Sequence, residues 1–152
     1  MRKSIAVLAC GVMVSLAAAA ADRGFRAEFV GGTLAEISKG SGARLDLTGA
    51  DALVVRTEHR EFLLEYRKIH TLEYGQNVSR RYAEAVLISP LLLLSKSRKH
   101  FVTIGYTDPA GDQQALVFRV RKGDIRSVLA GLEARTGRRV EYQDDEARKA
   151  GR

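Results

Sequence analysis

The feature that most constrains the fold is a pair of alternating segments at residues 100–121, "HFVTIGYTDPAGDQQALVFRVR". The second segment places three apolar side chains on one face: Leu116, Phe118 and Val120. A period of two is the period of a β-strand with one buried face. Between the segments, Pro109 and Gly111 supply the residue types that tight turns require. We therefore predict a β-hairpin over these residues and β-structure as the frame of the domain.

Shorter alternating segments precede this hairpin and are separated by turn residues, at 32–37, 43–49, 52–57, 60–66 and 69–75. After the hairpin, four apolar residues follow the spacing of a helix: Ile125, Val128, Leu129 and Leu132. Asp124 is the expected N-cap and Gly137 the expected terminator of a helix over 124–136. Val140 and Tyr142 allow one more short extended segment. We predict a mainly β (α+β) fold: a small antiparallel bent β-barrel or sandwich of six to seven strands, closed by one C-terminal amphipathic helix.

The N-terminus has the pattern of a secretory signal peptide, which we predict at residues 1–21. A positive "RK" pair opens it, an apolar stretch follows, and Ala19 and Ala21 give a small-x-small cleavage pattern. An uncleaved membrane anchor is the alternative, although the uncharged run over 4–21 is slightly shorter than a span of about 20 residues. We therefore expect export, with the mature chain periplasmic or secreted.

Removal of residues 1–21 would leave 152 − 21 = 131 residues, enough for one domain with its own hydrophobic core. It would also remove Cys10, the single cysteine, and with it disulfides, thiolate nucleophiles and cysteine-based zinc sites. The 25 Lys and Arg residues would become 23, against 18 Asp and Glu, which gives a net charge of 23 − 18 = +5. Because an exported protein meets little intracellular nucleic acid, we relate this charge to anionic envelope surfaces.

A longer framework, "FVGGTL…EYRKIHTLEYGQ…SKSRKHFVTIGYTDPAGDQQALVFRV…LEARTGRRVEY", resembles a group of uncharacterised exported bacterial proteins. These are similar to pleckstrin-homology-like, or GRAM-like, domains. The resemblance implies a bent β-barrel with a C-terminal helix over one end, covering residues 29–143. Residues 22–28 would be a polar lead-in. The charged end at 144–152 has no apolar stripe, so we predict a disordered tail there.

Pleckstrin-homology domains that bind phosphoinositide headgroups place basic residues on the first hairpin loop and the adjoining strand. The resemblance would put Lys39 and Arg44 near that position. Asp46 stands two residues after Arg44, where a further basic residue is expected, and so departs from the pattern. We therefore interpret "SKGSGAR" as a plain flexible turn, with anion binding as the lesser alternative.

Patterns of catalytic or metal-binding residues are weak in this sequence. None of His59, His70 and His100 has a second ligand at a zinc-like spacing. Ser41 lacks the Gly-x-Ser-x-Gly spacing of a nucleophile elbow. We predict no catalytic, cofactor-binding or metal-binding residues and no cofactor. The alternative is a small envelope hydrolase whose site is not evident from the sequence.

The apolar segment at 83–95 contains four consecutive leucines and is followed by basic residues that include Arg98 and Lys99. Leaving all four leucines in water would forgo about 6–12 kcal/mol, comparable with the stability of a whole domain, so most of them must be covered. Either the segment folds across the barrel as part of the core, or its outer leucines touch a membrane surface or a partner protein. It is too short to span a membrane, which takes about 20 residues.

These observations together favour an exported, non-catalytic binding or scaffold domain that acts at the cell envelope. Its expected partner is an anionic membrane surface or an envelope protein, with neither nucleic acid nor metal. The expected contact residues are Leu91, Leu92, Leu93, Leu94, Arg98 and Lys99.

Overall fold

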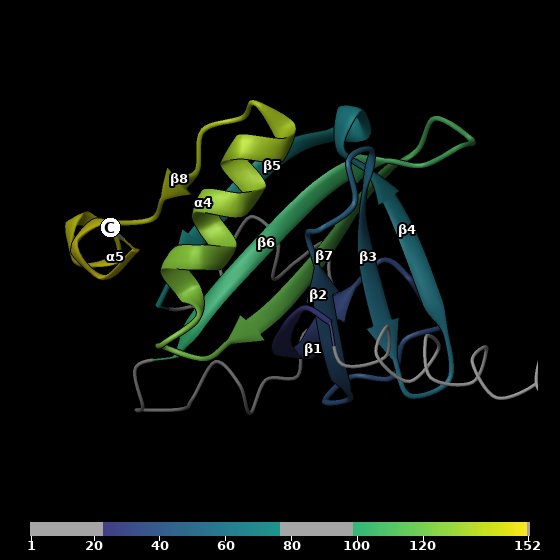
Figure 1. The fold of residues 1–152 in the computed structure, drawn as a ribbon, viewed down its shortest axis with the longest axis horizontal. Helices are drawn as coiled ribbons and strands as arrows, with labels where there is room; N and C mark the ends of the chain where they lie inside the picture. Colours follow the sequence, from purple (N-terminus) through teal and green to yellow (C-terminus); the bar gives the residue numbers. More distant parts are fainter. Residues whose placement is uncertain (1–22, 77–98, 152) are drawn as a thin grey trace, which may run out of the picture.

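The computed structural model describes residues 23–76 and 99–151. The expected signal peptide at 1–21 and the expected contact residues Leu91–Leu94 and Arg98 lie outside this part of the chain. The elements are, in chain order, β1 (Phe25–Gly32), β2 (Gly42–Asp46), β3 (Ala52–Thr57), β4 (Glu61–Glu65), the 3₁₀ turn η1 (Tyr66–Lys68), β5 (Ile69–Gly75), β6 (His100–Thr107), β7 (Gln113–Val120), α4 (Ile125–Thr136), β8 (Glu141–Tyr142) and α5 (Asp145–Gly151). Figure 1 shows α4 lying against the sheet, with β8 and α5 beside it.

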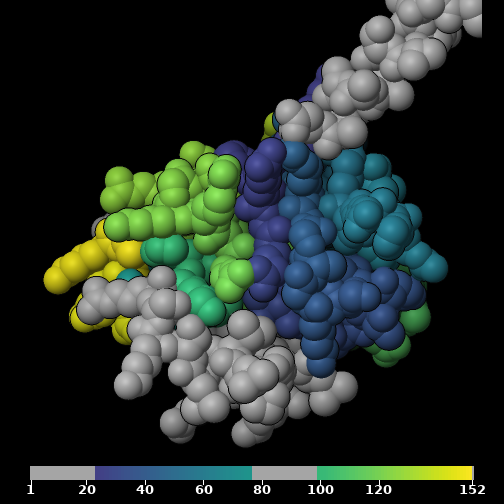
Figure 2. Space-filling model, turned by 90° about the horizontal axis from the view of Figure 1, so that it is seen from below, coloured from purple at the N-terminus to yellow at the C-terminus, as the bar shows by residue number. Residues whose placement is uncertain are grey.

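The strands form one mixed sheet in the order β4-β3-β2-β1-β7-β6-β5-β8. The pairs from β4 to β5 are antiparallel, and β8 pairs parallel with β5. On β1, Phe25 pairs with Leu45 of β2, and Phe29 pairs with Phe118 of β7. β1 thus joins two halves of the sheet, and Figure 2 shows it in purple between the blue β2–β4 half and the green half.

The mainly β fold is confirmed, but the predicted closure into a barrel is wrong because the sheet is open. Its edges are β4 and β8, and the chain passes from β4 to β5 through η1 rather than through strand pairing. The sheet has eight strands rather than six to seven, because the short segment at Glu141–Tyr142 pairs with Glu73 and Tyr74. That parallel pair also makes the sheet mixed rather than antiparallel throughout.

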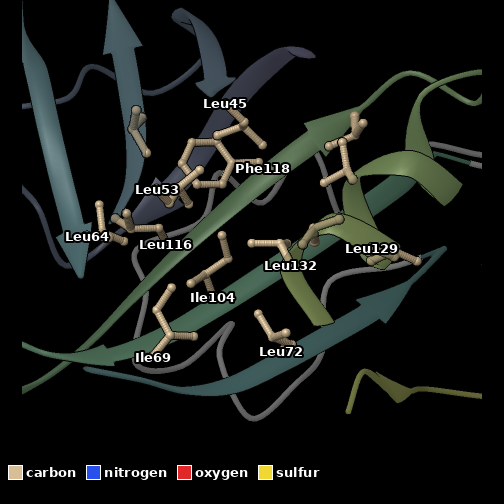
Figure 3. Close-up of a cluster of buried hydrophobic side chains, with 14 of the residues drawn as sticks. Leu45, Leu53, Leu64, Ile69, Leu72, Ile104, Leu116, Phe118, Leu129 and Leu132 are labelled. Atoms are coloured by element: carbon tan, nitrogen blue, oxygen red, sulfur yellow. The ribbon is translucent and has the colours of Figure 1, made fainter. Parts of the chain in front are cut away.

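The core lies where the two halves of the sheet and α4 meet, as Figure 3 shows. Leu45 and Leu53 come from the β2–β4 half, Ile104 and Phe118 from the β5–β7 half, and Leu132 from the helix. All five side chains are at most 1% exposed. This packing across a folded sheet is sandwich-like, and it follows from the alternation of apolar residues along each strand.

The first strand begins earlier than the sequence pattern predicted. Residues 25–28, assigned to a polar lead-in, belong to β1, and the strand predicted at 32–37 is mostly turn and coil. Ala27 and Phe29 contact the core, so Glu28 between them faces the other way. A register shift between Phe29 and Gly31 interrupts the alternation, and this bulge obscured the strand in the sequence.

Helix α4 matches its prediction closely. Its buried residues are the four that the spacing selected: Ile125, Val128, Leu129 and Leu132. Gly137 ends the helix with φ at 67°, a left-handed conformation that favours glycine. Asp124 precedes the helix as expected, but its carboxylate accepts a hydrogen bond from Arg121 Nε and makes no side-chain cap.

The predicted disordered tail is wrong, because residues 145–151 form the second helix, α5. Ala147 is fully buried, and Gly151 lies so close to Tyr142 that an added Cβ would be 2.7 Å from the ring atom Cε1. Two small residues one turn apart therefore let this helix approach the core without an apolar stripe. The Asp144 carboxylate accepts a hydrogen bond from the Ala147 amide, which helps to start the helix.

We expect Ala147→Asp to lower the free energy of unfolding by about 2–4 kcal/mol, because it places a charge without a partner where Ala147 is fully buried. Ala130→Asp is the matched control on an exposed position of α4 and should lower stability by less than about 1 kcal/mol, most of it helix propensity. Urea denaturation followed by circular dichroism measures both variants. Equal stabilities for the two would show that α5 does not pack as described.

Candidate anion-binding surface

A hollow of about 430 Å³ opens where β1 begins, β6 begins and β7 ends. We call it the β1–β7 hollow, and its lining residues are Arg26, Ala27, Glu28, Lys99, His100, Arg119, Val120, Arg121 and Lys122. These residues come from distant parts of the sequence. They meet because β7 pairs with both β1 and β6, antiparallel to each, so that the starts of β1 and β6 lie beside the end of β7.

A second hollow of about 580 Å³ adjoins the first and shares His100 and Lys122 with it. We call it the α5 hollow, and its lining residues are Gln76, His100, Lys122, Arg126, Glu146, Lys149 and Ala150. Together the two hollows are lined by seven Lys and Arg residues and two Glu residues. This basic surface is the largest concentration of positive charge that the described hollows contain.

The cations of the β1–β7 hollow differ in their pairing. Arg119 forms an ion pair with Glu28, and Arg121 forms one with Asp124 at 2.7 Å. The other three cations of this hollow, Arg26, Lys99 and Lys122, make no ion pair with any residue that the structure describes. Three positive charges are therefore left to attract an anion from solution.

His100 stands between the two hollows and has a defined partner. Its Nδ1 lies 2.5 Å from the Tyr74 hydroxyl, and the two rings are stacked with centroids 6.0 Å apart. Burial raises the pKa of Tyr74 to about 12, so the phenol keeps its proton, and the direction of its hydrogen bond with Nδ1 depends on the tautomer of His100. Burial, and then the nearby Lys122, lower the pKa of His100 and favour its neutral form.

The structure brings one of the sequence-predicted contact residues, Lys99, to this surface. Gln76, the last described residue before the undescribed segment, lines the α5 hollow, and Lys99, the first one after it, lines the β1–β7 hollow. The two described residues that flank the segment at 77–98 therefore both line the basic surface. Sequence reasoning missed most of the remaining members of the surface, because only the strand order brings them together.

The other basic pair, Lys39 and Arg44, is not brought to this surface. Lys39 is exposed on the connection after β1, and Arg44 on β2 pairs with Arg56 on β3, where both line another hollow of about 400 Å³. Asp46, the residue that departed from the pleckstrin-homology pattern, is only 3% exposed. It has a structural role in a polar network rather than a place at a binding surface.

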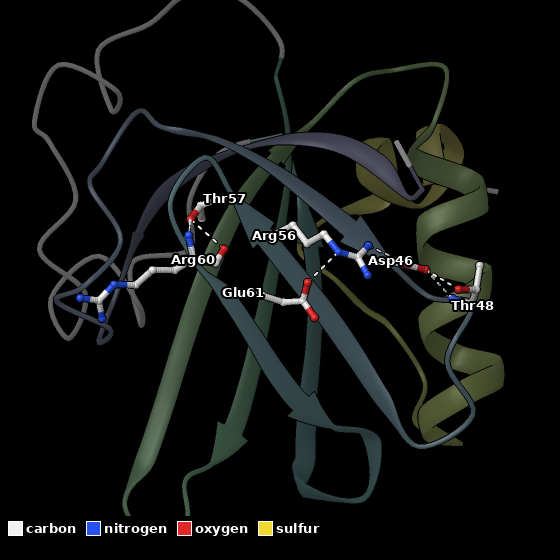
Figure 4. A network of polar contacts seen from close by, with 6 residues as sticks. All are labelled: Asp46, Thr48, Arg56, Thr57, Arg60 and Glu61. Atoms are coloured by element: carbon white, nitrogen blue, oxygen red, sulfur yellow. Dashed lines mark hydrogen bonds and ion pairs between the residues drawn. The ribbon is translucent and has the colours of Figure 1, made fainter. Parts of the chain in front are cut away.

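That network joins β2, β3 and β4 (Figure 4). Arg56 on β3 donates to Asp46 Oδ2 at 2.7 Å and to Glu61 Oε2 at 2.8 Å, while the Thr48 hydroxyl donates to Asp46 Oδ1 at 2.6 Å. Burial by itself would raise the pKa of Asp46, but the hydrogen bonds from Thr48 and Arg56 outweigh it and lower the pKa to about 2. The carboxylate therefore stays charged. Because Arg56 on β3 bonds both Asp46 on β2 and Glu61 on β4, the network links three neighbouring strands.

Of the three histidines, only His100 lines either hollow. His59 is exposed in the β3–β4 turn, whereas His70 on β5 contacts Thr71 through Nδ1 at 2.9 Å. Over residues 23–76 and 99–151, no group of three or more His, Cys, Asp or Glu side chains is placed to hold a metal ion. Neither of the helices in the described chain is long and apolar enough to cross a bilayer.

The fold and the surface thus define a mainly β domain with a basic surface at the end where α4 begins. No family model, curated protein or solved structure matches this chain.

Proposed function

We propose that the protein is an exported, non-catalytic binding domain that contacts an anionic membrane surface at the cell envelope. The observation that carries this proposal is the clustering of seven Lys and Arg residues around two adjoining hollows, whose lining includes Gln76 and Lys99, the described residues on either side of the segment at 77–98. The signal pattern at 1–21 supports export.

Basic and apolar groups would act together at such a membrane. A Lys or Arg near an anionic membrane surface contributes about 1 kcal/mol, so the three cations without an ion pair in the described chain would contribute about 3 kcal/mol. Leu91–Leu94, with Arg98 beside them, would add apolar contact with the acyl boundary. Two weak signals of this kind reinforce one another in membrane association.

We further propose that the fold is a pleckstrin-homology-like one with an open sheet. The order of the first seven strands, β4-β3-β2-β1-β7-β6-β5, is that of a meander in which β1 also pairs with β7. The helix α4 follows the last of them and packs on the core. This arrangement supports the resemblance of the 29–143 framework, while the binding surface proposed above lies away from the first hairpin loop.

A small envelope hydrolase is the second candidate, since His100 shares one hollow with Glu28 and the other with Glu146. Two contacts favour binding over catalysis. His100 Nδ1 faces Tyr74 rather than a carboxylate, and Glu28 is paired with Arg119. Turnover of ester or phosphoester substrates by the wild type, absent from His100→Asn, would favour the hydrolase instead.

We expect charge reversal at the basic surface to abolish membrane association. In the double variant Lys99→Glu/Lys122→Glu, vesicle flotation with anionic lipid should fall to the level seen with neutral lipid, because two attractive charges become repulsive. Lys39→Glu/Arg60→Glu changes the net charge by the same amount at exposed positions elsewhere, and it should float like the wild type. The same loss in both double variants would mean that overall charge, rather than this surface, drives association.

A further inference from the structure

We propose that the outer face of the sheet, the face turned away from the core, binds a linear anionic polysaccharide that lies across the strands from β3 to β6. The proposal goes beyond membrane contact, because it assigns a ligand to the hollow of about 400 Å³ on this face. We call it the β1–β3 hollow, and its lining residues are Arg26, Ala27, Gly42, Ala43, Arg44, Arg56, Thr57 and Glu58.

The strand register places three arginines side by side on the outer face. Arg26 on β1 pairs with Arg44 on β2, and Arg44 pairs with Arg56 on β3. The residues that precede them in the chain pack in or against the core: Phe25, Ala43 and Val55. Because successive side chains of a strand point to opposite faces, the three arginines point away from the core. We call them the arginine row.

The charge of the arginine row is offset at one end and not at the other. Like charges directly opposite each other on neighbouring strands are destabilising. Arg56 bonds both Asp46 and Glu61, which offsets the charge at the β3 end. At the β1 end, Arg26 is exposed and makes no ion pair with any residue over 23–76 and 99–151. A carboxylate bound beside Arg26 would therefore stabilise the row, and a guanidinium can hold it through two parallel hydrogen bonds.

The row continues into the β1–β7 hollow, because Arg26 lines both hollows. Lys99, at the start of β6, lines the far side of this continuous basic strip. From Arg56 on β3 to Lys99 on β6 the strip crosses five adjacent strands, a length of about 19 Å at the usual strand spacing of about 4.8 Å. A linear chain with repeated negative charges matches this shape better than a single small anion does.

The remaining groups of the β1–β3 hollow favour a polysaccharide among linear polyanions. Glu58 lines the hollow beside the arginines, and a carboxylate accepts hydrogen bonds from hydroxyl groups, which a sugar chain has and polyphosphate lacks along its length. No Phe, Tyr or Trp is among the described residues that line either hollow, whereas stacking on such rings is typical of single-stranded nucleic acid binding. Gly42 leaves room over the sheet, since an added Cβ there would meet no atom within 4 Å.

The test is isothermal titration calorimetry of the purified full-length protein with oligogalacturonates of increasing length. We expect the affinity to rise with length until the oligomer spans the basic strip and then to level off. The methyl-esterified oligomer, which has the same sugars without the charges, should not bind. Polyphosphate of equal charge should bind about tenfold more weakly, because it has no hydroxyl groups along its chain to donate. Equal or tighter binding of polyphosphate or single-stranded DNA would overturn the polysaccharide assignment, and absence of oligogalacturonate binding would overturn the whole inference.

Two pairs of variants locate the site. Arg26→Gln should weaken oligogalacturonate binding about tenfold, because it removes the cation that both hollows share. Arg60→Gln, at an exposed position outside both hollows, should leave the affinity unchanged. Gly42→Leu fills the β1–β3 hollow and should weaken binding by a similar factor, whereas Gly123→Leu, at another open glycine, should not.

Vesicle flotation separates this site from the membrane contact. Gly42→Leu leaves the β1–β7 hollow unchanged, so it should float on anionic vesicles like the wild type while it loses oligogalacturonate affinity. Wild-type affinity in both Arg26→Gln and Gly42→Leu would mean that the polysaccharide does not lie along the arginine row, and would overturn the proposed site.

Discussion

Replacing Phe118 by alanine will lower the free energy of unfolding by about 3–5 kcal/mol. Phe118 lies on the central strand β7 with no exposed surface, and its ring meets that of Phe29 edge-on, with centroids 5.8 Å apart at 61°. The substitution leaves a cavity between the two halves of the sheet, where no single element can move in to fill it. Since a domain of this size is stable by about 5–15 kcal/mol, this change removes much of the total.

The control for this prediction is Leu63→Ala on the edge strand β4. Leu63 is 69% exposed, so its truncation should change stability by less than about 0.5 kcal/mol. Urea denaturation of both variants, followed by circular dichroism, gives the comparison. A Phe118 variant no less stable than the Leu63 variant would contradict the placement of the core between the two halves of the sheet.

Replacing Arg56 by leucine will lower the free energy of unfolding at neutral pH by about 3–5 kcal/mol. The change leaves the Asp46 carboxylate, 3% exposed and 2.7 Å from Arg56 Nη1, without its cation. Arg60→Leu on the same hairpin is the control, because the Arg60 side chain is exposed and points away from the network (Figure 4). That control should change stability by less than about 0.5 kcal/mol.

The pH dependence of the free energy of unfolding distinguishes the Asp46–Arg56 ion pair from a contact that stabilises by packing alone. The Asp46 pKa of about 2 in the folded protein lies below its ordinary 3.8, so the group contributes about 2 kcal/mol that is fully present above pH 4 and is lost as pH falls toward 2. Below that pH Asp46 is neutral in wild type and variant alike. The deficit of Arg56→Leu should therefore shrink between pH 4 and pH 2. A deficit that stays constant over this range would mean that the ion pair does not stabilise the fold.

The sequence predicted those elements whose pattern is long and uninterrupted. The hairpin around Pro109 and Gly111 and the helix ending at Gly137 both form where the alternation and the helical spacing indicated. Where the pattern is short or broken, prediction failed. The bulge after Phe29 interrupts the alternation of β1, so the pattern did not predict that strand. Helix α5 packs through Ala147 and Gly151, two small residues that do not form an apolar stripe.

Of the residues that line the candidate site, the sequence analysis selected only Lys99, because its position next to the leucine run is visible along the chain. Lys99 was selected because it follows the leucine run, and it does line the basic surface. Arg26, Arg119 and Lys122 join it only because β1, β7 and β6 are adjacent in the sheet. Strand order depends on pairings between distant segments, and a period of two along one strand does not specify its neighbour.

The central claim is that the basic surface recognises an anionic membrane, and partition onto vesicles of graded anionic content tests it most directly. We predict that binding of the full-length protein rises steeply with the anionic fraction, exceeds binding to neutral vesicles, and weakens as salt is raised from 0.1 M to 1 M and the screening length falls from about 10 to about 3 Å. Binding that is equal on neutral and anionic vesicles, or unchanged by salt, would contradict the claim.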